Sequence, residues 1–121
     1  MADPNAVYPP DRVILRDVTL RDGLQMTRDW PTTAAKRALV GALHDAGLRH
    51  VEVGSFLPAD RMPQFADVRD VVGAVAARPG MHGVALALNE RGARDALSTD
   101  VAEITLVISA SEAHNRANAR R

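Results

Sequence analysis

The sequence contains no cysteine, and this absence excludes several kinds of site. Without a thiol, these residues cannot form a disulfide framework, a thiolate metal site or a cysteine nucleophile. The absence also fits a protein that works in a reducing compartment. We therefore expect a cytoplasmic location.

Net charge and long apolar runs are missing as well. The 15 Lys and Arg residues are balanced by 15 Asp and Glu residues, so the formal net charge is zero and the basic footprint of a nucleic-acid binder is absent. The first residues lack the apolar stretch of a signal peptide, and no run approaches the length that spans a bilayer. The expected partners include neither a nucleic acid nor a membrane.

The residues that are present predict an α/β fold. After a proline-rich leader at 1–12, which we expect to be flexible, short β-branched apolar runs alternate with longer segments of helical period. This alternation is typical of βα units with parallel strands. Strands are expected at 13–18, 51–54, 84–88 and 104–108, and helices at 33–46, at 64–77, in a short segment ending near Ser98 and after Ser111.

Four βα units make half of a common architecture. An eight-stranded (β/α) barrel needs about 200 to 250 residues, roughly twice this length. Such a chain forms either an open sheet with two exposed edges or a half barrel that is completed by other residues or by a partner. Length and periodicity leave both outcomes open for the 13–121 segment.

Residues suited to chemistry follow the expected strands. In parallel sheets, ligands collect at the carboxyl ends of the strands. The first strand leads into Arg21-Asp22-Gly23-Leu24-Gln25, which taken alone fits a binding site and a plain Asp-Gly turn equally well. The later strand ends contribute further polar residues, namely Glu52, Ser55, Asn89, Ser109, Ser111 and Glu112.

Glu52 is the unusual member of this set, because it lies between two valines in a run that is typical of a buried strand. A buried carboxylate needs a partner, which makes a structural ion pair with an arginine and a catalytic role equally acceptable. His50 and His82 precede the strands, at the opposite end of the sheet, and we expect them to be structural or solvated. No His-X-His spacing exists, and one carboxylate such as Asp22 does not hold a metal by itself.

Four segments together resemble a known family. They are 19–25, 52–56, 62–67 and 109–112 with Asn118, and their residues and order are similar to successive motifs of the hydroxymethylglutaryl-CoA lyases. These enzymes belong to a superfamily of metal-dependent TIM barrels that also contains isopropylmalate and homocitrate synthases. The resemblance covers about residues 12–121 and implies that 13–121 is the amino-terminal half of a TIM-barrel catalytic domain.

The resemblance implies roles for the site residues. Asp22 would be a ligand of Mg²⁺ or Mn²⁺, Arg21 would stabilise enolate charge, and Glu52 would hold Arg21 or organise the catalytic centre. A divalent cation and a fixed guanidinium suit the cleavage of a bond next to a carbonyl, because negative charge develops on the carbonyl oxygen. The resemblance also implies that Gln25, Asn89 and Ser111 contact the substrate, an acyl-CoA thioester.

Two departures from the family pattern limit this interpretation. The lyases usually carry a proline before the Arg-Asp-Gly-Leu-Gln run, whereas 17–20 is closer to the synthase form. The family's His-X-His ligands, later Asn ligand and catalytic cysteine belong to the second half of the barrel. The implied function is cleavage of a 3-hydroxy-3-methylacyl-CoA, with this fragment inactive alone.

Three alternatives stay open at this point. The first is an acyl-CoA-condensing synthase of the same superfamily. The second is a non-catalytic half barrel that binds a partner or pairs with itself through its open edges. The third is a flavodoxin-like sheet that binds a phosphate, which is less favoured because the first loop is not rich in Gly, Ser or Thr.

Overall fold

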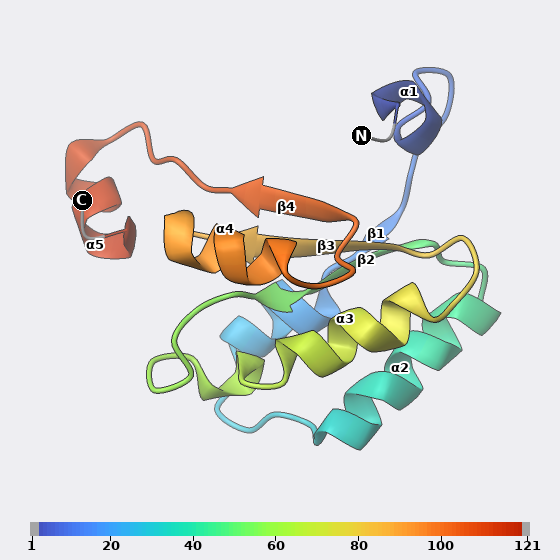
Figure 1. Ribbon diagram of the computed structural model, residues 1–121, viewed down its shortest axis with the longest axis horizontal. Coiled ribbons are helices and arrows are strands. Elements are labelled where there is room, and N and C mark those ends of the chain that lie inside the picture. Colours follow the sequence, from blue (N-terminus) through green and yellow to red (C-terminus); the bar gives the residue numbers. More distant parts are fainter. Residues whose placement is uncertain (1–2, 120–121) are drawn as a thin grey trace.

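The structure, a computed structural model, describes residues 3–119 and contains a four-stranded parallel sheet with strand order β1-β2-β3-β4 (Figure 1). Each strand pairs in parallel with the next one in the chain, as expected for consecutive βα units. The strands are β1 (Arg16–Asp17), β2 (His50–Ser55), β3 (His82–Ala87) and β4 (Glu103–Leu106). The predicted α/β class with parallel βα units is confirmed, and the sheet is not closed.

A helix follows each strand. These helices are α2 (Thr33–Asp45), α3 (Val68–Ala76), α4 (Glu90–Leu97) and α5 (Glu112–Ala119). Figure 1 shows α2 and α3 side by side against one face of the sheet. None of the helices within residues 3–119 is both long and apolar enough to cross a membrane.

The hydrophobic core lies between the sheet and α3. Val51 and Val53 of β2 are fully buried there, together with Val71 and Val75 of α3. Because side chains alternate along a strand, Glu52 lies on the opposite face of β2 from its two valine neighbours. The apolar face of the sheet is therefore covered by helices, while the other face carries a carboxylate.

The first strand is much shorter than the predicted 13–18. Only Arg16 and Asp17 pair with β2, and they are followed by η1 (Thr19–Gly23), a π-helical turn in place of the simple turn. Val13 and Leu15 are exposed at this edge. A strand at the edge of a sheet has a partner on one side only, so an apolar run at this position does not by itself determine the length of the strand.

The other boundaries differ by smaller amounts. The helix predicted from 64 is divided into a 3₁₀ turn, η2 (Pro63–Phe65), and α3. The fourth strand ends at Leu106, and Ile108 beyond it is exposed. Both open edges of the sheet thus present large apolar side chains to solvent.

The leader contains one helical turn, α1 (Pro4–Val7), which Asp3 caps by accepting a hydrogen bond from the Asn5 backbone. Tyr8 follows this turn and contacts the amino-terminal end of the sheet. The sequence did not indicate this contact. The boundary at residue 12 and the flexibility of the leader stay predictions.

Replacing Gly92 in α4 with alanine is expected to destabilise the fold. A β-carbon at this position would lie 2.6 Å from the carbonyl oxygen of Phe56, so backbone must move to admit it. We expect Gly92→Ala to lower the free energy of unfolding by about 1–3 kcal/mol, measured by urea denaturation. Gly73→Ala in α3 is the matched control: it meets nothing within 4 Å, and helix propensity should make it stabilising by about 0.5–1 kcal/mol. Equal effects of the two substitutions would contradict the close packing at Gly92.

Candidate active site

The candidate site is built on η1, at the carboxyl end of β1. Leu20 and Leu24 are buried and fix this turn against the core. Arg21, between them, extends its side chain to Glu52, and its Nε donates a hydrogen bond of 2.6 Å to Glu52 Oε2. The partner that burial demanded for Glu52 is thus Arg21. π-Helical turns occur often at functional sites, which agrees with the position of this one.

Asp22 contacts the same guanidinium. Its Oδ1 lies 3.2 Å from Arg21 Nη1, while its side chain is 54% exposed. Glu52, in contrast, is only 16% exposed. Arg21 therefore joins a mostly buried carboxylate to an exposed one.

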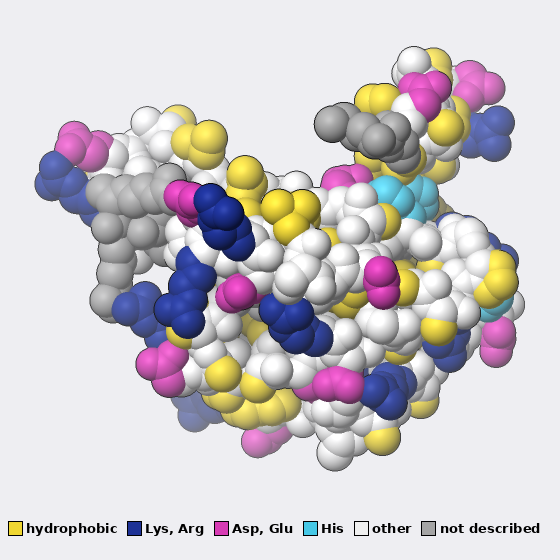
Figure 2. Space-filling view, viewed as in Figure 1, with side chains coloured by type: hydrophobic (Ala, Val, Ile, Leu, Met, Phe, Trp, Pro, Cys, Tyr) yellow, Lys and Arg dark blue, Asp and Glu magenta, His cyan; other side chains and the backbone are white. Residues whose placement is uncertain are grey.

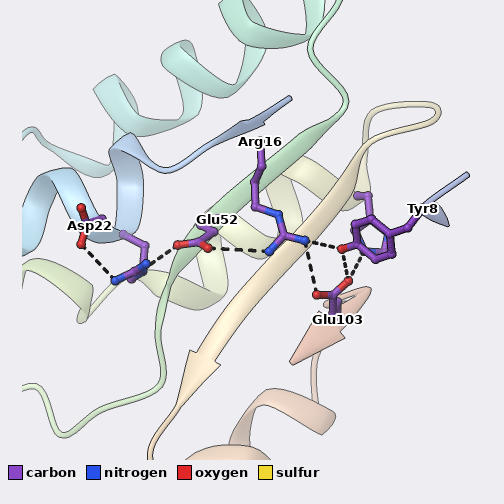
Figure 3. Close-up of polar contacts among 7 residues, drawn as sticks. Tyr8, Arg16, Asp22, Glu52 and Glu103 are labelled. Atoms are coloured by element: carbon purple, nitrogen blue, oxygen red, sulfur yellow. Dashed lines mark hydrogen bonds and ion pairs between the residues drawn. The ribbon is translucent and has the colours of Figure 1, made fainter. Parts of the chain in front are cut away.

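Glu52 has a second basic neighbour that sequence reasoning missed. Arg16 Nη1 lies 3.7 Å from Glu52 Oε1, on the other oxygen of the carboxylate. Arg16 also contacts Glu103 Oε1 at 3.4 Å and donates a hydrogen bond to the Tyr8 hydroxyl. Figure 3 shows the resulting row of contacts across the face of the sheet. The position of Arg16 within an apolar run of the sequence could have indicated that this arginine pairs with a carboxylate.

The predicted substrate-contact residues are not joined to this group by hydrogen bonds that the structure shows. Gln25 is exposed just beyond η1. Asn89 caps α4, where its Oδ1 accepts a hydrogen bond of 2.9 Å from the Gly92 backbone. Ser111 Oγ accepts one of 3.2 Å from the His114 backbone at the start of α5. The side chain of Asn118 lies outside the described residues, and the substrate roles stay predictions.

A buried lysine lies beneath the site. Lys36 of α2 is 3% exposed, and its Nζ donates hydrogen bonds of 2.6 Å to Gln64 O and to Asp67 Oδ1. Burial would raise the pKa of Asp67, but hydrogen bonds from Lys36 and Thr33 outweigh it, so the pKa of Asp67 is lowered. Gln64 Nε2 lies 3.5 Å from Leu24 O, which connects this group to the turn that carries Arg21. The burial of Lys36 could not be predicted from the sequence, because a lysine in a helix is normally exposed to solvent.

The predicted location of His50 and His82, at the end of the sheet opposite the site, is confirmed. Their ring centroids lie 4.9 Å apart, and the Tyr8 ring packs on both. Figure 2 shows histidine side chains where the leader meets the sheet. Burial, together with the neighbouring charges of His82 and Arg16, lowers the pKa of His50. Within the described part of the chain, His50 Nδ1 is buried without a hydrogen-bond partner.

This geometry can hold and orient one guanidinium. Metal binding is only partly supported: among residues 3–119 there is no cluster of three or more His, Asp or Glu side chains able to hold an ion. Asp22 can thus supply one oxygen ligand of the kind that Mg²⁺ and Mn²⁺ prefer, and no more.

Comparison with known proteins identifies the family of this chain. The model of the family described as HMGL-like matches residues 12–121. The chain belongs to the HMGL-like family. It is 39% identical over 109 residues to the 3-hydroxy-3-isohexenylglutaryl-CoA/hydroxymethylglutaryl-CoA lyase of Pseudomonas aeruginosa, a match that covers 90% of this chain and 36% of the relative.

Solved structures of HMG-CoA lyases show the same fold. The Bacillus subtilis enzyme superposes with a TM-score of 0.82 at 34% identity, covering 93% of this chain and 38% of that one. The Acinetobacter baumannii enzyme, solved with coenzyme A and 3-methylmalate, gives a TM-score of 0.81 at 33% identity over 89% of this chain and 35% of that one. This member of the HMGL-like family therefore corresponds to an amino-terminal portion of the barrel and spans about a third of the length of its curated relatives.

Replacing Lys36 with methionine tests the buried pair beneath η1. The substitution keeps the length of the side chain but leaves the half-buried Asp67 carboxylate and the Gln64 carbonyl without their donor. We expect a loss of about 3 kcal/mol in the free energy of unfolding.

The matched control for Lys36→Met is Arg37→Met, at the next position of α2. Arg37 pairs with Asp70 at 2.5 Å, but both side chains are about half exposed. Its removal should cost less than about 1 kcal/mol. A cost for Lys36→Met as small as for Arg37→Met would contradict the structural importance of the buried pair.

Acid should destabilise the fold first through His50. Below its usual pKa of 6.5 the unfolded chain takes up a proton at this position, whereas the folded chain, with its lowered pKa, stays neutral. The free energy of unfolding should therefore fall as pH decreases from 6.5 and level off below the folded-state pKa. The lowered pKa values of Glu103 and Asp67, usually 4.5 and 3.8, add losses at still lower pH.

Urea denaturation between pH 7.5 and about 5 measures this slope, a range that spans the ordinary titration of histidine. We expect His50→Phe, which keeps a ring between Tyr8 and His82, to reduce the slope. His44→Gln, in α2 and outside this ring cluster, should leave the contribution of His50 in place. An unchanged slope in His50→Phe would show that His50 is not the acid-sensitive group.

Proposed function

We propose that this chain forms the amino-terminal part of a barrel that cleaves a carbon–carbon bond in a 3-hydroxy-3-methylacyl-CoA. The observation that supports this proposal best is the ion pair between Arg21 and Glu52, with Asp22 on the same guanidinium, at the carboxyl end of the sheet. Membership of the HMGL-like family and the names of the relatives give the substrate class. The chain spans only about a third of the length of those relatives. The activity is therefore proposed for a barrel that this chain forms together with the missing second part.

Arg21 is the residue that acts on the developing charge. Glu52 accepts a hydrogen bond from Nε and so orients the planar guanidinium, whose Nη1 lies 3.2 Å from Asp22 Oδ1. When the carbon–carbon bond breaks, the 3-hydroxyl group gives up its proton and becomes the carbonyl group of one product, and the electron pair of the bond becomes an enolate whose charge lies on the thioester carbonyl oxygen. A fixed guanidinium stabilises that charge without having to reorganise.

Asp22 is proposed to bind the divalent cation, Mg²⁺ or Mn²⁺. Its carboxylate is exposed and provides a hard oxygen ligand, while residues 3–119 offer no cluster of three or more His, Asp or Glu side chains to complete a metal site. A bound cation would supply Lewis-acid stabilisation of negative charge on oxygen. With one carboxylate ligand, these 121 residues alone are expected to bind metal weakly and to turn over substrate poorly.

The remaining assignments are finer parts of the same proposal. Gln25, exposed just beyond η1, is proposed to contact the substrate near Arg21. Asn89 and Ser111 are proposed to contact the acyl-CoA from the ends of β3 and β4, although each side chain also caps a helix. Cytoplasmic localisation likewise stays a prediction.

A chimera tests the proposed function. In it, this 121-residue chain replaces the matching amino-terminal segment of the Pseudomonas aeruginosa relative, so that the second part of the barrel is present. We expect cleavage of hydroxymethylglutaryl-CoA with Mg²⁺ or Mn²⁺. Arg21→Lys keeps the charge but loses the planar fork, and should lower kcat by roughly 10²- to 10³-fold. Asp22→Asn should raise the metal concentration needed for half-maximal activity.

Arg94→Lys in the same chimera is the control, because Arg94 forms an exposed ion pair with Glu90 on α4. It should leave kcat unchanged. A folded chimera without activity, or full activity in Arg21→Lys, would contradict the proposal.

A further inference from the structure

We propose that Arg16 is a positioning residue of the candidate active site and that Tyr8, in the leader, fixes Arg16 in place. The inference rests on the proposed function for its catalytic consequence, but its geometric part stands on contacts in this chain. It also adds residues to the site that lie at the far end of the sheet.

The first step concerns the two oxygens of Glu52. Oε2 accepts the hydrogen bond from Arg21 Nε at 2.6 Å, while Oε1 faces Arg16 Nη1 at 3.7 Å. A carboxylate with one cationic partner can rotate about its last bond and still keep that partner. With cations on both oxygens its plane is defined, and so is the direction in which it holds Arg21.

The second step concerns what holds Arg16. Its Nη2 lies 3.4 Å from Glu103 Oε1 and donates a hydrogen bond to the Tyr8 hydroxyl. That hydroxyl donates in turn to Glu103 Oε2, so Tyr8 bridges the guanidinium and the carboxylate. The guanidinium carbon also lies 5.6 Å from the centre of the Tyr8 ring. Tyr8 thus fixes Arg16 between two glutamates, one on β2 and one on β4.

The third step concerns the charge of Glu103. Burial would raise its pKa, but hydrogen bonds from Tyr8 and His82 and the charge of Arg16 outweigh burial and lower it. Glu103 is therefore ionised at neutral pH and attracts Arg16 from the side opposite Glu52. If Tyr8 loses its hydroxyl, Arg16 has one hydrogen-bond acceptor fewer on the Glu103 side, and its balance between the two glutamates changes.

Tyr8 lies outside the residues that match the family model, which begin at 12. Figure 1 shows α1 beyond the amino ends of the strands, away from η1. Figure 3 shows the contacts that span this distance, from Tyr8 and Glu103 through Arg16 and Glu52 to Asp22. The leader therefore reaches the candidate active site through ionic contacts along one face of the sheet.

Hydrogen exchange at Arg21 tests this inference directly. In the ¹⁵N-labelled 121-residue chain, the Nε–H resonance of Arg21 reports its hydrogen bond to Glu52, and Arg21→Lys identifies it by its disappearance. Tyr8→Phe keeps the ring and removes the hydroxyl, while Arg16→Gln removes the charge. We expect each to speed exchange at Arg21 Nε–H about fivefold, the effect of one weakened hydrogen bond. Arg16→Lys, which restores a cation, should recover part of the protection.

The control is Arg12→Gln, because Arg12 pairs only with exposed Asp11, at 3.6 Å, among the contacts the structure shows for this segment. It should leave exchange at Arg21 unchanged. A lower melting temperature in Tyr8→Phe with unchanged Arg21 exchange would overturn the inference, since Tyr8 would then only anchor the leader.

The catalytic consequence is measured separately in the chimera. There Tyr8→Phe should lower kcat about fivefold and leave KM unchanged, because the positioning of Arg21 matters for the developing charge. An inactive unsubstituted chimera would contradict the proposed function, whereas the exchange measurement would still decide the role of Tyr8 and Arg16. Unchanged kcat together with faster exchange would overturn the catalytic part.

Discussion

The burial of the Glu52 carboxylate is the constraint on which the candidate site depends. An ionised carboxyl group that is 16% exposed must be compensated by nearby cations, and the fold brings Arg21 and Arg16 to its two oxygens. Both arginines come from the short segment around β1, which must therefore lie next to β2 in one register. Pairing of Arg16 with His50 and Asp17 with Val51 provides that register. The negative charge of Glu52 therefore favours both the arrangement of the site and the pairing of β1 with β2.

Much of this could be predicted from the sequence where the information is local. The alternation of apolar runs and helical segments gave the parallel βα order, and Glu52 between two buried valines implied a cationic partner. The length of β1 could not be predicted, because an apolar run does not reveal how many of its residues find a partner strand. Tyr8 and Glu103 are 95 residues apart, so their contact has no local signature. Lys36 is buried only because Asp67 and Gln64 happen to face it in three dimensions.

The two faces of the sheet explain why a polar row and an apolar core coexist in so small a structure. Val51 and Val53 pack on α3, whereas Glu52 between them joins Arg16 and Glu103 on the other face. In a closed barrel this second face is the interior, where a charged side chain needs an oppositely charged partner to offset the loss of solvation. The row is continuous for that reason: Glu52 lies between two guanidinium groups, and each guanidinium lies between two acceptors.

Arginine at positions 16 and 21 follows from the same geometry. Arg21 presents Nε to Glu52 and Nη1 to Asp22, and Arg16 presents Nη1 to Glu52 and Nη2 to Tyr8 and Glu103. A lysine carries the same charge on one atom and cannot keep two fixed directions at once. The rigid fork therefore transmits orientation as well as charge: where Tyr8 holds one edge of Arg16, the other edge defines Glu52, and Glu52 defines Arg21. A row of polar contacts along one face of the sheet thus joins a leader residue at one end to an exposed carboxylate at the other.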